Sequence, residues 1–221
     1  MAVLEYLANV LVFSSIIVLA SIGLSLIYSI ARFANFAHGD TMTVGAYGAF
    51  VGFALIGDLG PSLLGLPAGF YLAVAVGAVV AAVVAVLTQR LVYDALEVGA
   101  IGLLITSIGV AFVYRAVVIL GFGASKVRYA VPSQRPIPAL VPMGVRITTQ
   151  EVAMIIVAVT LVVGLHLLLR YTLLGRMMRA TADNADLAQV TGIRTARITR
   201  WTWVIGAGLA GVGGVFLGLY N

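Results

Sequence analysis

The stretch NFAHGDTMTVGAY, residues 35–47, places an amide, an imidazole and a carboxylate within six residues: Asn35, His38 and Asp40. These side chains can donate and accept hydrogen bonds, and could therefore line the path of a polar solute. The apolar run before the stretch is long enough to cross a membrane, whereas the run after it, residues 41–57, is short and contains three early glycines, Gly45, Gly48 and Gly52. The question is which elements position these groups.

Two interpretations of this stretch remain open. A short, glycine-broken span beside a polar break is typical of a discontinuous transporter helix. The break would then be lined by Asn35, His38, Gly39, Asp40, Gly45 and Tyr47, with the glycines allowing close backbone approach. Alternatively, the stretch is an ordinary cytoplasmic turn in which Asp40 caps the next helix through its first free amide groups. In both interpretations, Asp40 lies at the start of a helix.

The composition identifies a membrane protein. Hydrophobic residues make up 62% of the 221 residues and charged residues 10%, with a mean hydropathy of +1.13. Soluble domains carry about 25% charged residues. The apolar runs lack the period-two alternation of barrel strands, so we expect an all-α polytopic bundle of transmembrane helices in one domain, residues 1–221. The expected spans are residues 6–30, 42–57, 67–90, 98–121, 149–169 and 201–220.

The net charge of +5 is explained by loop arginines that set topology, so no nucleic-acid partner is expected. The loop 170–200 carries six arginines against two aspartates and is predicted to be cytoplasmic, which places the N-terminus outside. The loop 122–148 should then be external although it is basic; its four prolines indicate an ordered segment. Its cations are Lys126, Arg128, Arg135 and Arg146. Arg115, inside the fourth span, is expected to reach toward the outer face.

Small residues recur every four positions in three spans, which predicts close helix packing or, alternatively, a dimer seam. They are Gly48 and Gly52; Ala73, Gly77, Ala81 and Ala85; and Gly206, Ala210, Gly214 and Gly218.

A second polar cluster lies in the cytoplasmic loop. Asp183 is the expected N-cap of a short amphipathic helix, residues 184–191, with Asp186 at its third position. Leu187 and Val190 would form its apolar face, and Gly192 would follow its end. Such a helix could lie on the membrane surface or dock into a groove of a soluble partner.

No catalytic or metal-binding residue is predicted. The chain has no cysteine and two histidines, which cannot build a usual zinc site, and it lacks the H-E-x-x-H and G-x-S-x-G motifs. Its single lysine is followed by valine, so no phosphate-binding loop is present. The chain is therefore not expected to be an enzyme, and any ATP hydrolysis must come from another chain.

The two polar clusters together are similar to a known family. NFAHGDTMTVGAY resembles the N-F-A-H-G-[ED]-x-x-x-x-G-A-Y signature of the membrane permeases of high-affinity branched-chain amino acid ABC importers. GRMMRATADNADLAQVTGI, residues 175–193, resembles the same family's G-R-x-x-R-A-x-A-[ED] loop. The similarity runs from about Gly23 to the end. It implies a permease without cofactors of its own, in the cytoplasmic (inner) membrane of a prokaryote, that translocates leucine, isoleucine or valine.

The resemblance also implies roles and partners. The second motif would contact the ATPase subunit through Arg176, Arg179, Asp183, Leu187, Val190 and Gly192. The expected partners are a second permease, two ATP-binding subunits that hold ATP and Mg²⁺, and an extracytoplasmic substrate-binding protein that meets the basic loop 122–148. Members of the family are longer, with about eight spans, so this chain is expected to be a C-terminally truncated copy or a fragment.

Alternatives remain at this point. Similar permeases carry urea or short amides, and the spans do not distinguish these solutes. A secondary transporter would need ion-coupling carboxylates within its spans, whereas the acidic residues here lie in loops or at span ends. A structural membrane subunit is the remaining class.

Overall fold

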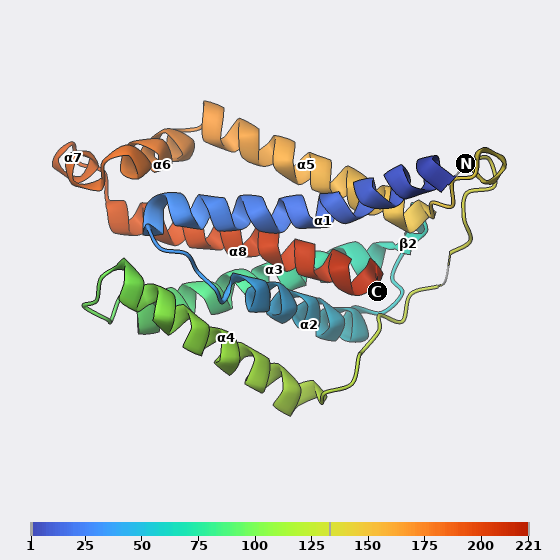
Figure 1. Cartoon of the computed structure of the whole chain (residues 1–221), viewed down its shortest axis with the longest axis horizontal. Helices are drawn as coiled ribbons and strands as arrows, with labels where there is room; N and C mark the ends of the chain where they lie inside the picture. Colours follow the sequence, from blue (N-terminus) through green and yellow to red (C-terminus); the bar gives the residue numbers. More distant parts are fainter. Residues whose placement is uncertain (1, 133, 221) are drawn as a thin grey trace.

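The protein, seen in a computed structural model that describes residues 2–132 and 134–220, is built almost wholly of helices (Figure 1). The long helices are α1 (Ala2–Ala31), α2 (His38–Ile56), α3 (Ala68–Thr88), α4 (Ala100–Phe122), α5 (Thr149–Tyr171) and α8 (Thr195–Tyr220). Among the described residues these six helices, α3 together with the π-helix that follows it, are long and apolar enough to cross a membrane. The expected transmembrane bundle is confirmed.

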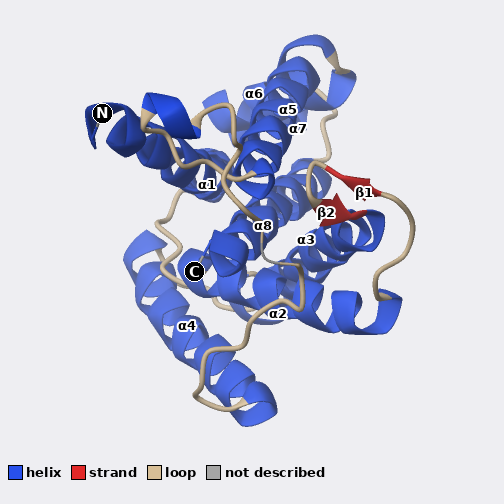
Figure 2. Cartoon of the chain, turned by 90° about the vertical axis from the view of Figure 1, so that its right-hand side faces the viewer, coloured by secondary structure: helices blue, strands red, loops and turns tan. Residues whose placement is uncertain are grey.

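Helix α8 forms the centre of the bundle. In Figure 2 it lies among α1, α2 and α3, and half of its residues are buried. Helices α4 and α5 lie at the periphery on opposite sides, and α4 has only two buried residues, Ser107 and Val110. Two short helices, α6 (Leu173–Asp183) and α7 (Ala185–Val190), lie at the end of the bundle away from the N-terminus.

Glycine contacts explain how α8 fits between its neighbours. A methyl group on Gly214 would collide with the carbonyl group of Met42, and one on Gly77 would lie 2.5 Å from the carbonyl oxygen of Gly45. These positions require the absence of a side chain because backbones approach each other there. The predicted close packing is confirmed. The regularly spaced small residues of α3 and α8 pack against other helices of this chain, except that Gly218 is half-buried and faces Tyr129.

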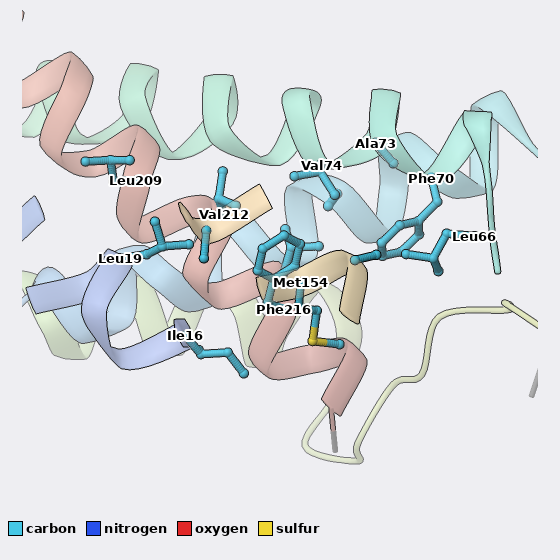
Figure 3. Packing of buried hydrophobic residues seen from close by; sticks show 14 of the residues in the cluster. Ile16, Leu19, Leu66, Phe70, Ala73, Val74, Met154, Leu209, Val212 and Phe216 are labelled. Atoms are coloured by element: carbon cyan, nitrogen blue, oxygen red, sulfur yellow. The ribbon is translucent and has the colours of Figure 1, made fainter. Parts of the chain in front are cut away.

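An apolar cluster fills the bundle beside α8 (Figure 3). Ile16 and Leu19 come from α1, Phe70 from α3, Met154 from α5 and Phe216 from α8. Because this cluster joins helices from both halves of the sequence, it fixes α1 and α8 beside each other, and with them the segment that follows α1.

Four local elements differ from the sequence expectation. Helix α8 starts at Thr195 rather than at residue 201, and α6 was not expected at all. Helix α6 begins where the Thr172 hydroxyl accepts a hydrogen bond from the Gly175 amide, and it buries one face through Met178 and Thr181.

A hairpin of two short strands, β1 (Ser62–Leu63) and β2 (Leu66–Pro67), joins α2 to α3. A π-helix, Gln89–Tyr93, ends α3.

The described part of the loop between α4 and α5, predicted to be ordered from its prolines, lies at the same end of the bundle as the N-terminus (Figure 1). Pro136 forms a bridge with Thr148, and the Ile137 amide donates to the Ile147 carbonyl over 2.9 Å. Gln134 reaches the Gly65 carbonyl of the hairpin turn. The loop also contains a 3₁₀ turn, Val141–Met143.

Candidate functional site: a polar break inside the bundle

The segment between α1 and α2, residues 32–37, is non-helical, and its buried and exposed positions alternate. Phe33, Asn35 and Ala37 are each at most 5% exposed. The segment begins at Arg32, whose φ of 60° turns the chain sharply away from the end of α1. We call residues 32–40 the polar break.

The polar break lies part-way along the helix bundle. The His38 imidazole contacts the Ala20 carbonyl oxygen at 3.0 Å through Nε2. Ala20 lies eleven residues before the end of α1, or about 16 Å at 1.5 Å per residue. The chain therefore turns back into the bundle after α1, and α2 starts part-way along it (Figure 1). This geometry matches the discontinuous helix and not the ordinary cytoplasmic turn.

Irregular backbone at this depth needs internal hydrogen-bond partners. The Asn35 side-chain oxygen accepts hydrogen bonds from the Ala37 amide at 3.1 Å and from the Tyr93 hydroxyl at 3.2 Å. The Phe36 amide donates to the hydroxyl of Ser107 on α4 at 3.0 Å. Asn35 is therefore a structural support of the break. The partners outside the break come from the π-helix after α3, which bonds Asn35, and from α4, which bonds Phe36.

Asp40 has a different role from the one expected. The residue before α2 is Ala37, which makes no side-chain cap, and the Asp40 carboxylate lies 3.2 Å from the guanidinium of Arg115. The capping role was wrong, although Asp40 does lie in the first turn of α2. Arg115, which was expected to reach toward the outer face, pairs with Asp40 while its side chain remains 60% exposed. A carboxylate within the bundle attracts the guanidinium because each charge is costly alone at this depth.

Two buried polar atoms in this region have no hydrogen-bond partner in the described chain: Nδ1 of His38 and Oε1 of Gln89. His38 is 4% exposed and Gln89 is 3% exposed. Buried polar groups are normally satisfied by protein or water. The break therefore has hydrogen-bonding capacity that its own packing does not use.

A cavity of about 420 Å³ opens beside the break. Its walls are α2 between Gly39 and Phe50, residues 126–129 of the loop after α4, and the last turns of α8. Gly39 and Tyr47 line this cavity, and a methyl group added to Gly39 would meet no atom within 4 Å. Its volume lies within the range of about 300–1,000 Å³ typical of small-molecule sites.

The structure separates the six sequence-predicted path residues into four groups. Gly39 and Tyr47 line the cavity, while Asn35 and His38 are buried within the break. Asp40 pairs with α4. The sixth, Gly45, is not brought to the cavity, since it packs against Gly211 of α8.

Sequence reasoning missed the roles of Lys126, Arg128 and Tyr129 in this cavity. The Tyr129 hydroxyl donates to the Ala46 carbonyl at 2.8 Å and holds the loop against α2. Burial raises the pKa of the Tyr129 phenol, and nearby Tyr47 raises it further, so the hydroxyl remains a donor. The basic character of the loop was visible in the sequence, but its approach to α2 was not.

The predicted coupling residues gather at the opposite end, on α6, α7 and the turn after them. Leu187 and Val190 are 61% and 85% exposed, and the other four are exposed as well: Arg176, Arg179, Asp183 and Gly192. The cap of α7 is Asn184, whose side chain accepts from the Leu187 amide at 3.0 Å, so the assignment of Asp183 was wrong. The shorter helix, α7, leaves Asp183 as the last residue of α6.

Gly192 ends α7 as predicted. Its φ is 90°, and the following Ile193 amide donates to the Ala188 carbonyl at 3.0 Å. This is the hydrogen-bond pattern of a Schellman cap, which favours glycine at the left-handed position.

Two arginines tie these short helices to the bundle. The Arg32 guanidinium donates to the Ala182 carbonyl near the end of α6, and the Arg179 guanidinium donates to the Leu169 carbonyl of α5. Cations are favourable at helix C-termini, where carbonyl groups are unpaired. Arg32 is the first residue of the polar break, so the break and α6 are in direct contact.

Comparison with known proteins gives the family. The model described as "Branched-chain amino acid transport system / permease component" matches residues 6–221. This chain belongs to that permease family. It is 32% identical to the high-affinity branched-chain amino acid transport system permease protein LivH of Escherichia coli K12, over 98% of this chain and 71% of LivH. It is 30% identical to BraD, the corresponding Pseudomonas aeruginosa permease protein, with the same coverage.

A more distant relative is archaeal. The probable branched-chain amino acid transport permease protein LivH of Methanocaldococcus jannaschii is 27% identical, over 96% of this chain and 65% of the relative. No solved structure matches this chain significantly.

Family membership identifies the protein as a multi-pass membrane permease component of a branched-chain amino acid ABC import system, and not as its ATPase. No cofactor is expected in a subunit of this kind. An importer of this class implies ATPase and binding-protein partners.

Proposed function

We propose that the protein translocates leucine, isoleucine or valine inward across the cytoplasmic membrane, and that the solute passes the polar break. The observation that carries this proposal is the start of α2 inside the bundle, where His38 meets Ala20 of α1. Broken helices of this kind line substrate paths in transporters because they expose backbone and polar groups at membrane depth. The cavity at Gly39 supplies space for the solute.

The proposed orientation places α6 and α7 in the cytoplasm and the loop 123–148 outside. The six arginines of residues 170–200 favour this orientation by the positive-inside rule. The exposed apolar pair on α7, Leu187 and Val190, then faces the cytosol, where an ATPase groove would cover it. Closure of the ATPases would move α7, and through α6 and Arg32 it would move the break.

Two further partners are proposed. A second permease would pair with this one beside the bundle, and a binding protein would deliver solute at the basic outer loop. The four loop cations, Lys126, Arg128, Arg135 and Arg146, are all exposed. Exposed charges of this kind steer an oppositely charged partner into contact.

Uptake of radiolabelled leucine tests the proposal. Cells that lack the gene should take up leucine more slowly, and the full-length gene should restore the rate. Unlabelled isoleucine and valine should compete, whereas urea and acetamide should not. Restoration of urea or acetamide uptake without leucine uptake would instead support the short-amide alternative and overturn the proposed solute.

A further inference from the structure

The cavity beside α2 has an unusual charge. The basic segment Lys126–Val127–Arg128 forms one wall, and no acidic residue lines the cavity. In the described chain neither Lys126 nor Arg128 has an ion-pair or hydrogen-bond partner. Asp40, the nearest acidic position in sequence to the lining residue Gly39, is already paired with Arg115. The cavity therefore presents two cations whose charge the protein does not neutralise.

The remaining walls are apolar or weakly polar. Met42 and Phe50 of α2 and Leu217 of α8 contribute apolar surface, and Thr43 and Tyr47 contribute hydroxyl groups. The Tyr129 hydroxyl is occupied, because it donates to the Ala46 carbonyl and so fixes the basic segment over the cavity. A solute that fits these walls has one anionic end and one aliphatic end.

We infer that this cavity is a solute site in which Lys126 and Arg128 bind the carboxylate of an aliphatic amino acid. The inference rests on the proposed transport function and names the group by which the permease itself selects its solute. A guanidinium binds a carboxylate through two parallel hydrogen bonds, and such charge-assisted bonds are stronger than neutral ones. Solutes without a carboxylate, such as urea or leucinamide, cannot make these bonds. The aliphatic side chain lies against Met42 and Leu217.

The same two cations could serve the binding protein instead, and the loop offers an internal comparison. Arg135 and Arg146 are exposed cations of the same loop that do not line the cavity. Docking of an acidic protein surface would use all four cations, whereas solute binding uses only Lys126 and Arg128. The double variants K126Q/R128Q and R135Q/R146Q each remove two positive charges, so a comparison of the two distinguishes solute binding from docking of the binding protein.

The test uses thiol protection, for which the chain is suited because it contains no cysteine. Ala46→Cys places one thiol on the cavity wall, and Val127→Cys provides a second reporter on the opposite wall. Membranes that contain the full chain are treated with an anionic thiosulfonate reagent, and the modification rate is measured with and without L-leucine, L-leucinamide or urea.

L-leucine should slow modification of both reporters, whereas leucinamide and urea should not. K126Q/R128Q should raise the leucine concentration needed for half protection by about tenfold or more, as expected for loss of charge-assisted hydrogen bonds. R135Q/R146Q should leave it unchanged. Equal protection by leucinamide or urea, no protection by leucine, or full protection in K126Q/R128Q would each overturn the inference.

Leucine uptake measured in the same cells separates this inference from the proposed function. If uptake depends on the protein while leucine protects neither reporter, the permease function stands and the carboxylate site is wrong. If uptake does not depend on the protein, the proposed function itself is wrong.

Discussion

The guanidinium of Arg32 donates a hydrogen bond to the carbonyl of Ala182. These residues lie 150 positions apart in the sequence, at the start of the polar break and near the end of α6. Asn184, two residues after Ala182, caps α7. Arg32 is therefore one direct contact between the polar break and the end of α6, next to the start of α7.

Removal of the Arg32 side chain should weaken coupling. We expect Arg32→Gln to lower leucine uptake by roughly three- to tenfold, because a hydrogen bond from a charged donor is lost. ATPase association, measured by co-purification, should persist, since α7 itself is unchanged. Arg32→Lys should restore part of the uptake. Arg194→Gln, at an exposed arginine between α7 and α8, is the matched control. Equal loss of uptake in the control would contradict this role.

Two glycines near the break should respond in opposite ways to a methyl group. Gly39→Ala should preserve or slightly raise thermal stability, because nothing lies within 4 Å and alanine is favoured over glycine in helices by about 0.5–1 kcal/mol. It should nevertheless reduce uptake, since the methyl group enters the cavity. Gly214→Ala should destabilise the protein by about 1–3 kcal/mol through collision with Met42. Normal uptake in Gly39→Ala would show that Gly39 does not line the solute path.

The Asp40–Arg115 pair should show coupled effects on stability. Asp40→Asn and Arg115→Gln should each lower the thermal unfolding temperature in lipid nanodiscs, because each leaves a charge without its partner. We expect the double neutral variant to be at least as stable as either single variant. Arg90→Gln, at an exposed cation that ends a span, serves as the control. Additive losses in the double variant would mean that the two charges act independently.

The apolar face of α7 should determine ATPase association. Leu187→Ser should reduce co-purification of the ATPase by about tenfold, since this side chain is 61% exposed and would be buried on docking. Gln189→Ala changes an exposed polar residue of the same helix and should have little effect. Full association in Leu187→Ser would show that α7 is not the contact.

Composition predicted the general architecture well. Long apolar runs with few charges require helices that satisfy their own backbone, so six spans could be placed within a few residues. Gly192 was also predictable, because glycine after an amphipathic turn is a local signal that needs no tertiary information.

The depth of the polar break was not predictable from sequence alone. Whether residues 32–37 leave the bundle or return into it depends on contacts with Ala20, Tyr93 and Ser107, which come from three other segments. The partner of Arg115 was missed for the same reason. Helix α6 was missed because its arginines and its position between two spans made the segment resemble a loop, although Thr172 and the buried face of Met178 were readable signals.

Sequence also could not separate Gly39 from Gly45. Both lie in the same motif, but one lines a cavity and the other packs against Gly211. The difference arises from which face of α2 turns toward α8, and that depends on the packing of the whole bundle.

The central claim is that the solute path enters from outside and passes the polar break. Gly39→Cys in the otherwise cysteine-free chain tests it directly, with a membrane-impermeant thiol reagent applied to intact cells. Val190→Cys on α7 and the fully buried Ser107→Cys serve as controls.

We predict that Gly39→Cys is modified from outside and is protected by leucine, while Val190→Cys reacts only after the cells are permeabilised. Ser107→Cys should not react in either condition. Modification of Val190→Cys in intact cells, or of Gly39→Cys only after permeabilisation, would contradict the proposed path and its orientation.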